Sequence, residues 1–147
     1  MKTLHDREAR DKLGARLQGL ASGKQAQWGK FTCPQMLAHV ADGLRMALGE
    51  LPVNSKNSPL RYWPLKQLII YWLPFPKGAP TAPELLARPA QSIDEELRTI
   101  GLLLNKFGDH KGHAHWPAHP AFGQLTEVDW GVLQYKHIEH HLRQFGC

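Results

Sequence analysis

The chain is poor in cysteine: it has only Cys33 and Cys147, which lie far apart in the sequence. Such a pair forms neither a CxxC metal or redox motif nor a framework of several disulfides, so the stability has to come from a hydrophobic core. A chain with so few cysteines is typical of proteins in a reducing compartment. The N-terminal residues are charged from the start and lack the apolar region of a signal peptide. We therefore expect a cytoplasmic protein.

Long hydrophobic runs are also absent. The most apolar stretch, residues 60–75, is interrupted by Pro64 and Pro74 and is too short to span a bilayer. No segment shows a convincing alternation of apolar and polar residues, and no internal repeat or low-complexity tract is visible. The sequence therefore favours a helical globule over a membrane-spanning or β-rich protein.

Several catalytic motifs are missing, and each absence excludes a class of enzyme. An HExxH metalloprotease motif would need glutamate where Ile138 stands, and no ExxH motif for a carboxylate-bridged di-iron site occurs. Neither GxSxG nor a phosphate-binding P-loop is present. The net charge of +5 is mildly basic without a dominant cluster of lysine and arginine, so we expect no nucleic-acid partner.

What the sequence does contain is a set of helix start signals. Thr32 with Gln35, Ser92 with Glu95, and Thr126 with Asp129 have capping-box spacing. Apolar residues make up 42% of the 147 residues, which fits one domain over residues 1–147 with one core. We predict an all-α bundle of four main helices with a short helical insertion between helices two and three. The predicted helices cover residues 4–20, 32–48, 60–75 (the short insertion), 92–106 and 126–146.

The last predicted helix has two stripes at helical spacing. Its apolar stripe is predicted to face the core. The polar stripe beside it points into the bundle or to its mouth. The apolar stripe contains Val128, Tyr135, Ile138, Leu142 and Phe145, and the polar stripe contains Gln134, His137, His141 and Gln144.

His137 and His141 are four residues apart, so their Cβ atoms lie about 5–6 Å from each other on one helix face. His39 flanks the apolar stripe of the second helix, and Gly43 leaves open space one turn later. If the two helices pack antiparallel, three imidazoles could meet around one ion, with a fourth position open, as in catalytic zinc sites. Nickel, iron and copper also accept imidazole. The alternative is that these histidines are ordinary hydrogen-bonded helix or core residues.

Several other polar residues could have a role near the three histidines, but the sequence supports these roles less strongly. Gln134, Gln144, Tyr135 and Asp42 could orient the ligands or a substrate, or could be ordinary helix residues. Cys33 at the start of a helix could be a reactive thiolate, although a small buried residue is the simpler interpretation.

The remaining histidines lie mainly between the last two helices. His119, in the motif HPAFG, is a candidate catalytic residue for orienting groups or shuttling protons; the alternative is a turn residue. We expect a solvated His-rich loop and an outward-facing histidine on the last helix rather than further ligands. These are His110, His113 and His115 in the loop, and His140 on the helix.

The insertion is rich in aromatic residues. It could line a hydrophobic substrate pocket, form a dimer interface, lie on a membrane surface, or simply pack over one end of the bundle. Its aromatic and basic residues are Arg61, Tyr62, Trp63, Trp72 and Phe75.

Three blocks of the sequence resemble a known superfamily. They are MLAHVADGLRMALGE at residues 36–50, HPAFG at residues 119–123, and a block at residues 130–146 that ends in YKHIEHHLRQFG. Together they resemble the DinB-like superfamily of helical bundles, and the last block is closest to a branch known only as a domain of unknown function. The resemblance covers most of the chain. It implies an up-down-down-up four-helix bundle with a mononuclear three-histidine metal site, for which His39, His137 and His141 are the matching positions.

The superfamily includes thiol-dependent transferases, isomerases and metal-dependent hydrolases. The resemblance therefore implies a divalent metal ion, zinc or nickel first, and a small-molecule substrate such as one reacting with a low-molecular-weight thiol. A homodimer is compatible with it, and we do not expect a membrane as the main partner. The alternative is a non-catalytic module that binds a partner, ligand or membrane surface through residues 60–75.

Overall fold

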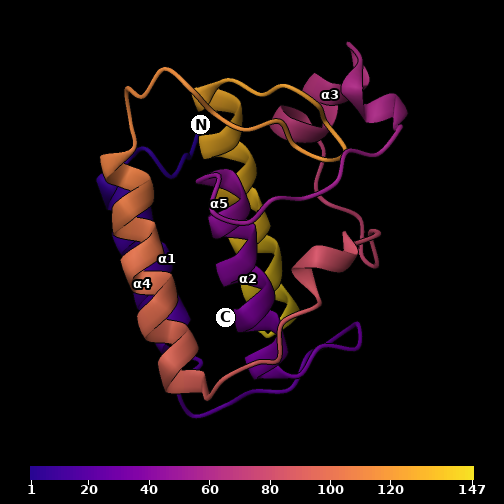
Figure 1. The fold of residues 1–147 in the computed structure, drawn as a ribbon. Helices are drawn as coiled ribbons and strands as arrows, with labels where there is room; N and C mark the ends of the chain where they lie inside the picture. The colour runs from indigo at the N-terminus through magenta and orange to yellow at the C-terminus, as the bar shows by residue number, and fades with distance from the viewer.

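The computed structural model describes all residues from 1 to 147, and four long helices dominate it (Figure 1). They are α1 (Arg7–Gln18), α2 (Cys33–Ala47), α4 (Ile93–Asp109) and α5 (Glu127–Gln144). Short turns of helix lie between α2 and α4: η1 (Pro59–Arg61), α3 (Leu65–Gln67), the π-helix η2 (Leu68–Trp72) and η3 (Pro83–Leu85). The only extended pairing is an isolated bridge between His119 and Gly123. The predicted all-α class is therefore confirmed.

The helix starts follow the local capping signals. All three predicted capping boxes form, with the side chains of Thr32, Ser92 and Thr126 each accepting a hydrogen bond from the third residue of its helix. The first helix begins at Arg7 rather than residue 4, because Asp6 caps it. The α4 helix runs to Asp109, three residues beyond the predicted end at residue 106.

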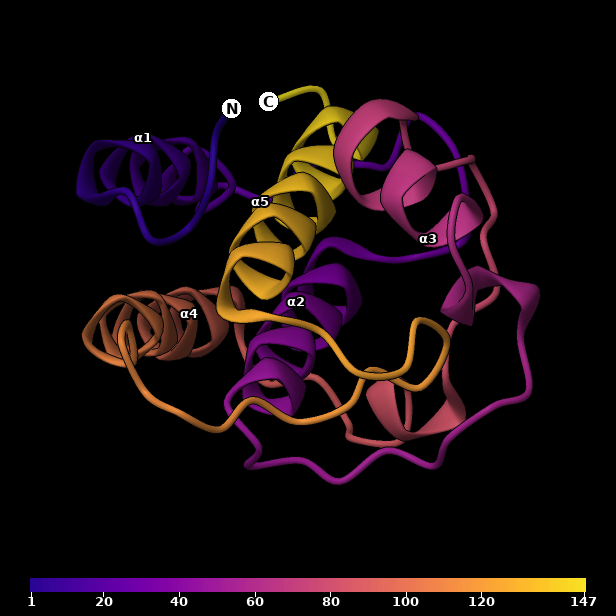
Figure 2. The same ribbon diagram turned by 90° about the horizontal axis from the view of Figure 1, so that it is seen from above.

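The four long helices run in two directions. The C-terminal part of α1 meets that of α5 through Arg16 and Glu139, so these two helices are parallel. Both α2 and α4 run the opposite way (Figure 1). Seen from above, α1 and α4 lie together on one flank, α2 and α5 occupy the middle, and residues 50–90 wrap the other flank (Figure 2). None of the helices combines the length and the apolar character needed to cross a membrane.

One contiguous core fills the space between these helices, and it includes most of the predicted apolar positions. Val128 is an error in that prediction, because its side chain is 55% exposed. Trp130, two residues later on the opposite side of the helix, is fully buried in its place. The fully buried large side chains are Leu4, Leu13, Leu20, Met36, Leu37, Leu44, Ile70, Ile100, Phe107, Trp130, Ile138 and Phe145.

The insertion is held against α5 by polar contacts. The Lys136 ammonium group donates hydrogen bonds to the carbonyl oxygens of Ile69, Ile70 and Leu73 at 2.5–2.9 Å, and so caps the C-terminal end of η2. The Tyr71 hydroxyl donates to the Asp129 carboxylate. The predicted short helix is thus present, but as a turn of α-helix followed by a π-helix.

A buried ion-pair network ties α2 to α4. Arg88, in the segment before α4, contacts Asp42 at 3.2 Å and Glu96 at 2.6 Å, and both carboxylates are almost inaccessible to solvent. Burial acts to raise the pKa of Glu96, but the hydrogen bonds from Arg88 and from the Gln91 amide hold the pKa below its usual value. Arg88 is therefore a structural clamp that fixes the segment leading into α4.

Candidate metal centre

Three histidines from two helices meet between α2 and α5. His39 Nε2 lies 2.9 Å from His137 Nε2, which in turn lies 3.2 Å from His141 Nε2. Ligand atoms of the three residues all lie within 4.8 Å of one another. The structure therefore brings together the three histidines that the sequence singled out.

The close approach of the two helices depends on a missing side chain. A Cβ atom at Gly43 would lie 3.0 Å from His137 Cε1 and 3.2 Å from His137 Nδ1. Those distances are tighter than most real contacts of a Cβ atom. The His137 ring therefore occupies the space that a larger residue at position 43 would fill.

The outer nitrogens of the rings face oxygen atoms. His39 Nδ1 lies 3.4 Å from the Leu85 carbonyl oxygen, and His141 Nδ1 lies 2.8 Å from Gln144 Oε1. Both oxygens are acceptors, so these rings carry their proton on Nδ1 and leave the Nε2 lone pair facing the cluster. The buried Gln134 side chain has an Oε1 atom without a hydrogen-bond partner, 3.7 Å from the place where a Cβ atom of residue 43 would lie.

Burial keeps the cluster uncharged. Loss of solvent lowers the pKa of His39, takes the pKa of His137 well below its ordinary value, and lowers the pKa of His141 to about 3. Neutral imidazole is the form that ligates metal ions. Nitrogen atoms bound to one tetrahedral zinc ion are about 3.3 Å apart, from the usual zinc–nitrogen distance of about 2.0–2.1 Å. The two short separations in the cluster are close to that value.

The loop before α2 covers one side of the cluster. The Phe31 ring stacks on His39 with ring centres 5.3 Å apart and meets His141 edge-on at 5.9 Å. Gln144, which accepts from His141, also donates through Nε2 to the Trp28 carbonyl oxygen at 2.8 Å. The predicted orienting role of Gln144 therefore matches its contacts, and the same side chain anchors the covering loop.

A cavity of about 490 Å³ opens against His39. Its size lies in the range of small-molecule sites. Its walls combine apolar side chains from Phe31 and Leu85 with the charged groups of Lys30 and Arg88. A substrate that reaches the histidines from this side would contact both apolar and polar groups.

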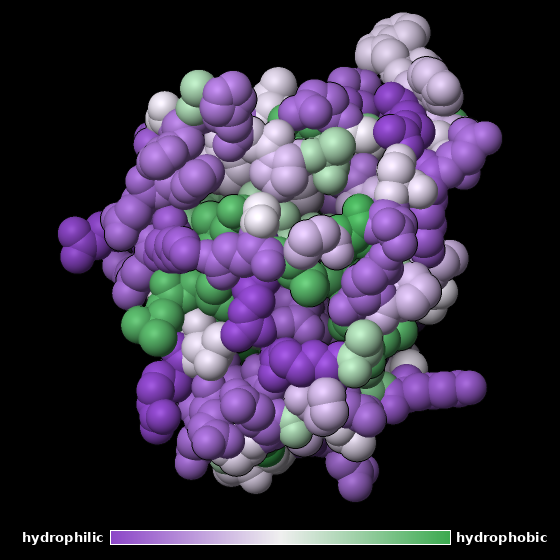
Figure 3. All heavy atoms as spheres, viewed as in Figure 1, coloured by the Kyte–Doolittle hydropathy of each residue, from purple (hydrophilic) through white to green (hydrophobic).

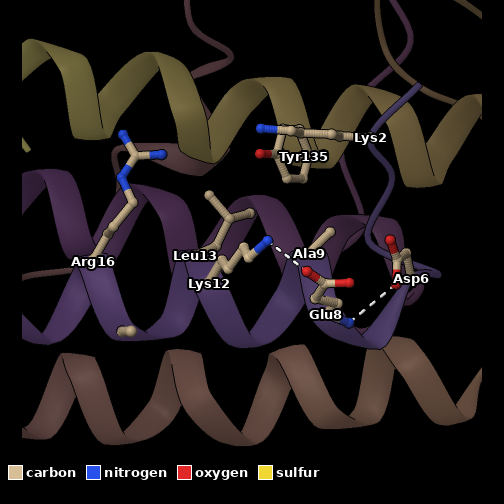
Figure 4. Close-up of a pocket in the computed structure, with 9 residues that line it drawn as sticks. Lys2, Asp6, Glu8, Ala9, Lys12, Leu13, Arg16 and Tyr135 are labelled. Atoms are coloured by element: carbon tan, nitrogen blue, oxygen red, sulfur yellow. Dashed lines mark hydrogen bonds and ion pairs between the residues drawn. The ribbon is translucent and has the colours of Figure 1, made fainter.

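A second cavity, of about 500 Å³, lies between α1 and α5 and contains none of these histidines (Figure 4). Tyr135 lines it, and Lys2 lies over the Tyr135 ring at 5.9 Å. The suggestion that Tyr135 orients a metal ligand is therefore wrong, because its side chain faces the α1 flank.

Other suggested residues have different surroundings. Asp42 is bound by Arg45 and Arg88 rather than by a histidine, so it is not the orienting partner suggested above. Cys33 is buried, and burial raises the pKa of its thiol, which favours the interpretation as a small core residue. His140 packs edge-on against Trp28 and is half-buried rather than outward-facing.

The exposed loop histidines form no cluster with the three ligand candidates. The rings of His110 and His113 stack on each other with centres 4.1 Å apart, and both residues belong to the surface loop that follows α4. Stacked rings direct their nitrogens sideways rather than toward a shared point. The interpretation of a solvated His-rich loop fits this arrangement.

His119 lies at the end of the bundle, where its ring packs on Phe122 and Trp130. Its Nδ1 atom accepts hydrogen bonds from the backbone amides of Ala121 and Phe122 at 3.1 and 3.2 Å. The proton of the neutral ring must therefore be on Nε2, and burial lowers the pKa of His119 to about 4. At neutral pH this side chain can donate a hydrogen bond, but it carries no positive charge.

The depressed pKa of His119 makes a prediction about stability against acid. Above pH 6.5 the ring is neutral in both states, but between pH 6.5 and about 4 only the unfolded chain takes up the proton, so the free energy of unfolding falls as the pH is lowered. The substitution His119→Asn should remove up to about 3 kcal/mol of this pH dependence. Urea denaturation at several pH values, with a chelator present to keep the protein metal-free, measures this free energy of unfolding. The variant His115→Asn, which removes an exposed histidine, is the control. An unchanged pH profile in His119→Asn would contradict the assignment.

Comparison with known proteins gives one match. No curated protein and no solved structure matches the chain. A family model described as "Protein of unknown function (DUF1569)" matches residues 3–146, which include α1 to α5 and all three clustered histidines. With nearly its whole length covered by that match, the chain belongs to this family of unknown function.

Proposed function

We propose that this protein binds one divalent metal ion, zinc or nickel, through His39, His137 and His141. One observation carries the proposal: the Nε2 atoms converge, while oxygen acceptors engage the Nδ1 atoms of two of the rings. His39 and His141 thus present Nε2 lone pairs to the same point as His137 Nε2, and a cation bound there would be ligated by all three neutral imidazoles.

The proposed reaction is a metal-dependent thiol transfer or hydrolysis of a small molecule in the cytoplasm. It rests on the resemblance to the DinB-like superfamily, which the directions of the four long helices support. When bound, the ion would act as a Lewis acid that polarises a substrate group or lowers the pKa of a thiol. Three protein ligands leave one position for a substrate, and the cavity against His39 is the route by which it would arrive.

The alternative is a non-catalytic module that the metal stabilises. A screen with small thiols plus electrophilic acceptors, and with esters, separates the two functions. For an enzyme we expect turnover that chelator removes and added metal restores. Metal-dependent thermal stabilisation without turnover of either substrate class would favour the binding module.

Removing a ligand should abolish metal binding. We expect the wild-type protein, purified without a histidine tag, to hold about one metal ion per chain. The variants His39→Ala, His137→Ala and His141→Ala should each lose most of it, as measured by elemental analysis. Metal in excess should raise the melting temperature of the wild type and leave these variants unchanged, because stabilisation requires binding to the folded state.

His115→Ala is the matched control, since it removes an exposed imidazole from the loop after α4. It should bind metal as the wild type does. Equal metal content in the wild type and in all three ligand variants would remove the proposed site.

Gly43→Ala should weaken metal binding without deleting a ligand. The new methyl group would meet the His137 ring at about 3.0 Å, so the ring has to move away from the other two. Small displacements of the surroundings of a metal site cost about 10–100-fold in affinity. A competition titration with a chromophoric chelator measures the loss.

The control is Gly101→Ala on α4, where a Cβ atom would meet nothing within 4 Å. The control should keep its metal affinity and gain up to about 1 kcal/mol of stability from helix propensity. A Gly43→Ala variant with wild-type affinity would show that the contact between α2 and His137 does not set the ligand geometry.

A further inference from the structure

The insertion displays a group of large apolar side chains to solvent. Trp63 and Trp72 are about four-fifths exposed, at 80% and 79%. Six of the ten exposed large hydrophobic residues of the chain fall within residues 62–73. We call them the insertion patch: Tyr62, Trp63, Leu65, Leu68, Trp72 and Leu73. On an ordinary protein surface, exposed apolar side chains are scattered singly, whereas here six of them lie on one short segment.

The exposed residues follow helical spacing. Leu65, Leu68 and Trp72 stand at positions i, i+3 and i+7 of the continuous turn formed by α3 and η2, so they share one face. Ile70 on the other side of the same turn is fully buried. In the space-filling view, pale side chains project from the corner where Figure 1 places α3 (Figure 3). The segment is therefore amphipathic, with an apolar face that nothing in the chain covers.

The patch is held firmly in place. Lys136 binds three carbonyl oxygens at the end of η2, and Tyr71 binds Asp129. Lys66 donates to the Gln124 carbonyl oxygen from the turn that precedes α5. Trp72 is thus presented on a fixed turn and Trp63 directly before it, so binding through them would not have to order a long flexible loop.

The segment that carries the patch has basic side chains and no acidic ones. Residues 51–83 contain no aspartate or glutamate and four basic residues: Lys56, Arg61, Lys66 and Lys77. This segment therefore carries a charge of +4, nearly all of the net charge of +5. The acidic group that contacts η2, Asp129, is buried and bonded from the inner side. An anionic partner is favoured, and a second copy that faces the same patch would be repelled.

We propose that the insertion patch docks on the surface of a lipid bilayer that contains anionic phospholipids. Tryptophan and tyrosine rings prefer the level of the lipid headgroups, and the exposed leucines reach the boundary of the acyl chains. The flanking lysine and arginine residues neutralise lipid phosphates. Exposed aliphatic leucines have no role in the stacking of nucleic-acid bases, which is why lipid fits the patch better than a single-stranded nucleic acid. This docking needs no metal ion and is independent of the reaction proposed above.

The test is co-sedimentation of the full chain with vesicles of neutral phosphatidylcholine, and with vesicles that also contain about 30% phosphatidylserine. We expect binding to the anionic vesicles that weakens at least about tenfold when salt rises from about 0.05 to 0.5 M. The double variant Trp63→Ser/Trp72→Ser should bind at least about tenfold more weakly. Its melting temperature should stay near that of the wild type, because both side chains are exposed.

Leu102→Ser is the matched control, since Leu102 is 67% exposed on α4 outside the patch. It should bind vesicles like the wild type. Failure of the wild type to sediment with anionic vesicles overturns the proposal, as does equal binding by the tryptophan variant. Binding to single-stranded DNA or to an acidic polypeptide, with none to vesicles, would assign the patch to another partner and also overturn it.

Discussion

The close packing of α2 against α5 at Gly43 is the constraint on which the site depends. Without a side chain at that position, the His137 ring fits between the helices and reaches within 2.9 Å of His39. A glycine inside a helix costs about 1 kcal/mol relative to alanine, and three buried imidazoles cost further solvation energy. A protein built only for stability would fill this space with apolar side chains. The geometry of the cluster is therefore obtained at the expense of stability in the metal-free chain.

The surroundings of the cluster come from segments far apart in the sequence. Leu85 supplies a carbonyl oxygen from η3, and Gln144 connects His141 to the Trp28 carbonyl oxygen in the loop before α2. Arg88 fixes the segment after η3 through two buried carboxylates. A ligand that pulls the three rings together would therefore also tighten the loops that frame the cavity against His39. The three rings and the walls of that cavity therefore share supporting contacts in this fold.

Local signals made much of this structure predictable from sequence. The capping boxes at Thr32, Ser92 and Thr126 involve residues three apart, so they are readable without knowledge of the fold. The pairing of His137 with His141 follows from one helical turn, whereas His39 could be added only by assuming antiparallel packing or from the family resemblance. Residues whose partners are distant could not be predicted in this way.

Two residues on α5 illustrate the same limit. The helix period could not show that Val128 faces solvent, nor that Tyr135 faces α1 rather than the histidines. The Lys136 contacts at the C-terminal end of the π-helix also join positions more than sixty residues apart.

The number of protein ligands bears on what the site is for. Structural zinc sites are closed by four protein ligands, whereas catalytic sites keep a position open. Besides the three histidines, no cysteine, aspartate or glutamate belongs to the group that could hold an ion, and the cavity lies directly against His39. Near Gly43 and the cluster, the buried Gln134 Oε1 atom has no hydrogen-bond partner within the protein, so it remains free to accept a hydrogen bond. Three protein ligands would leave one position of a bound ion open, next to a cavity of substrate size, which is why we propose chemistry rather than a purely structural ion.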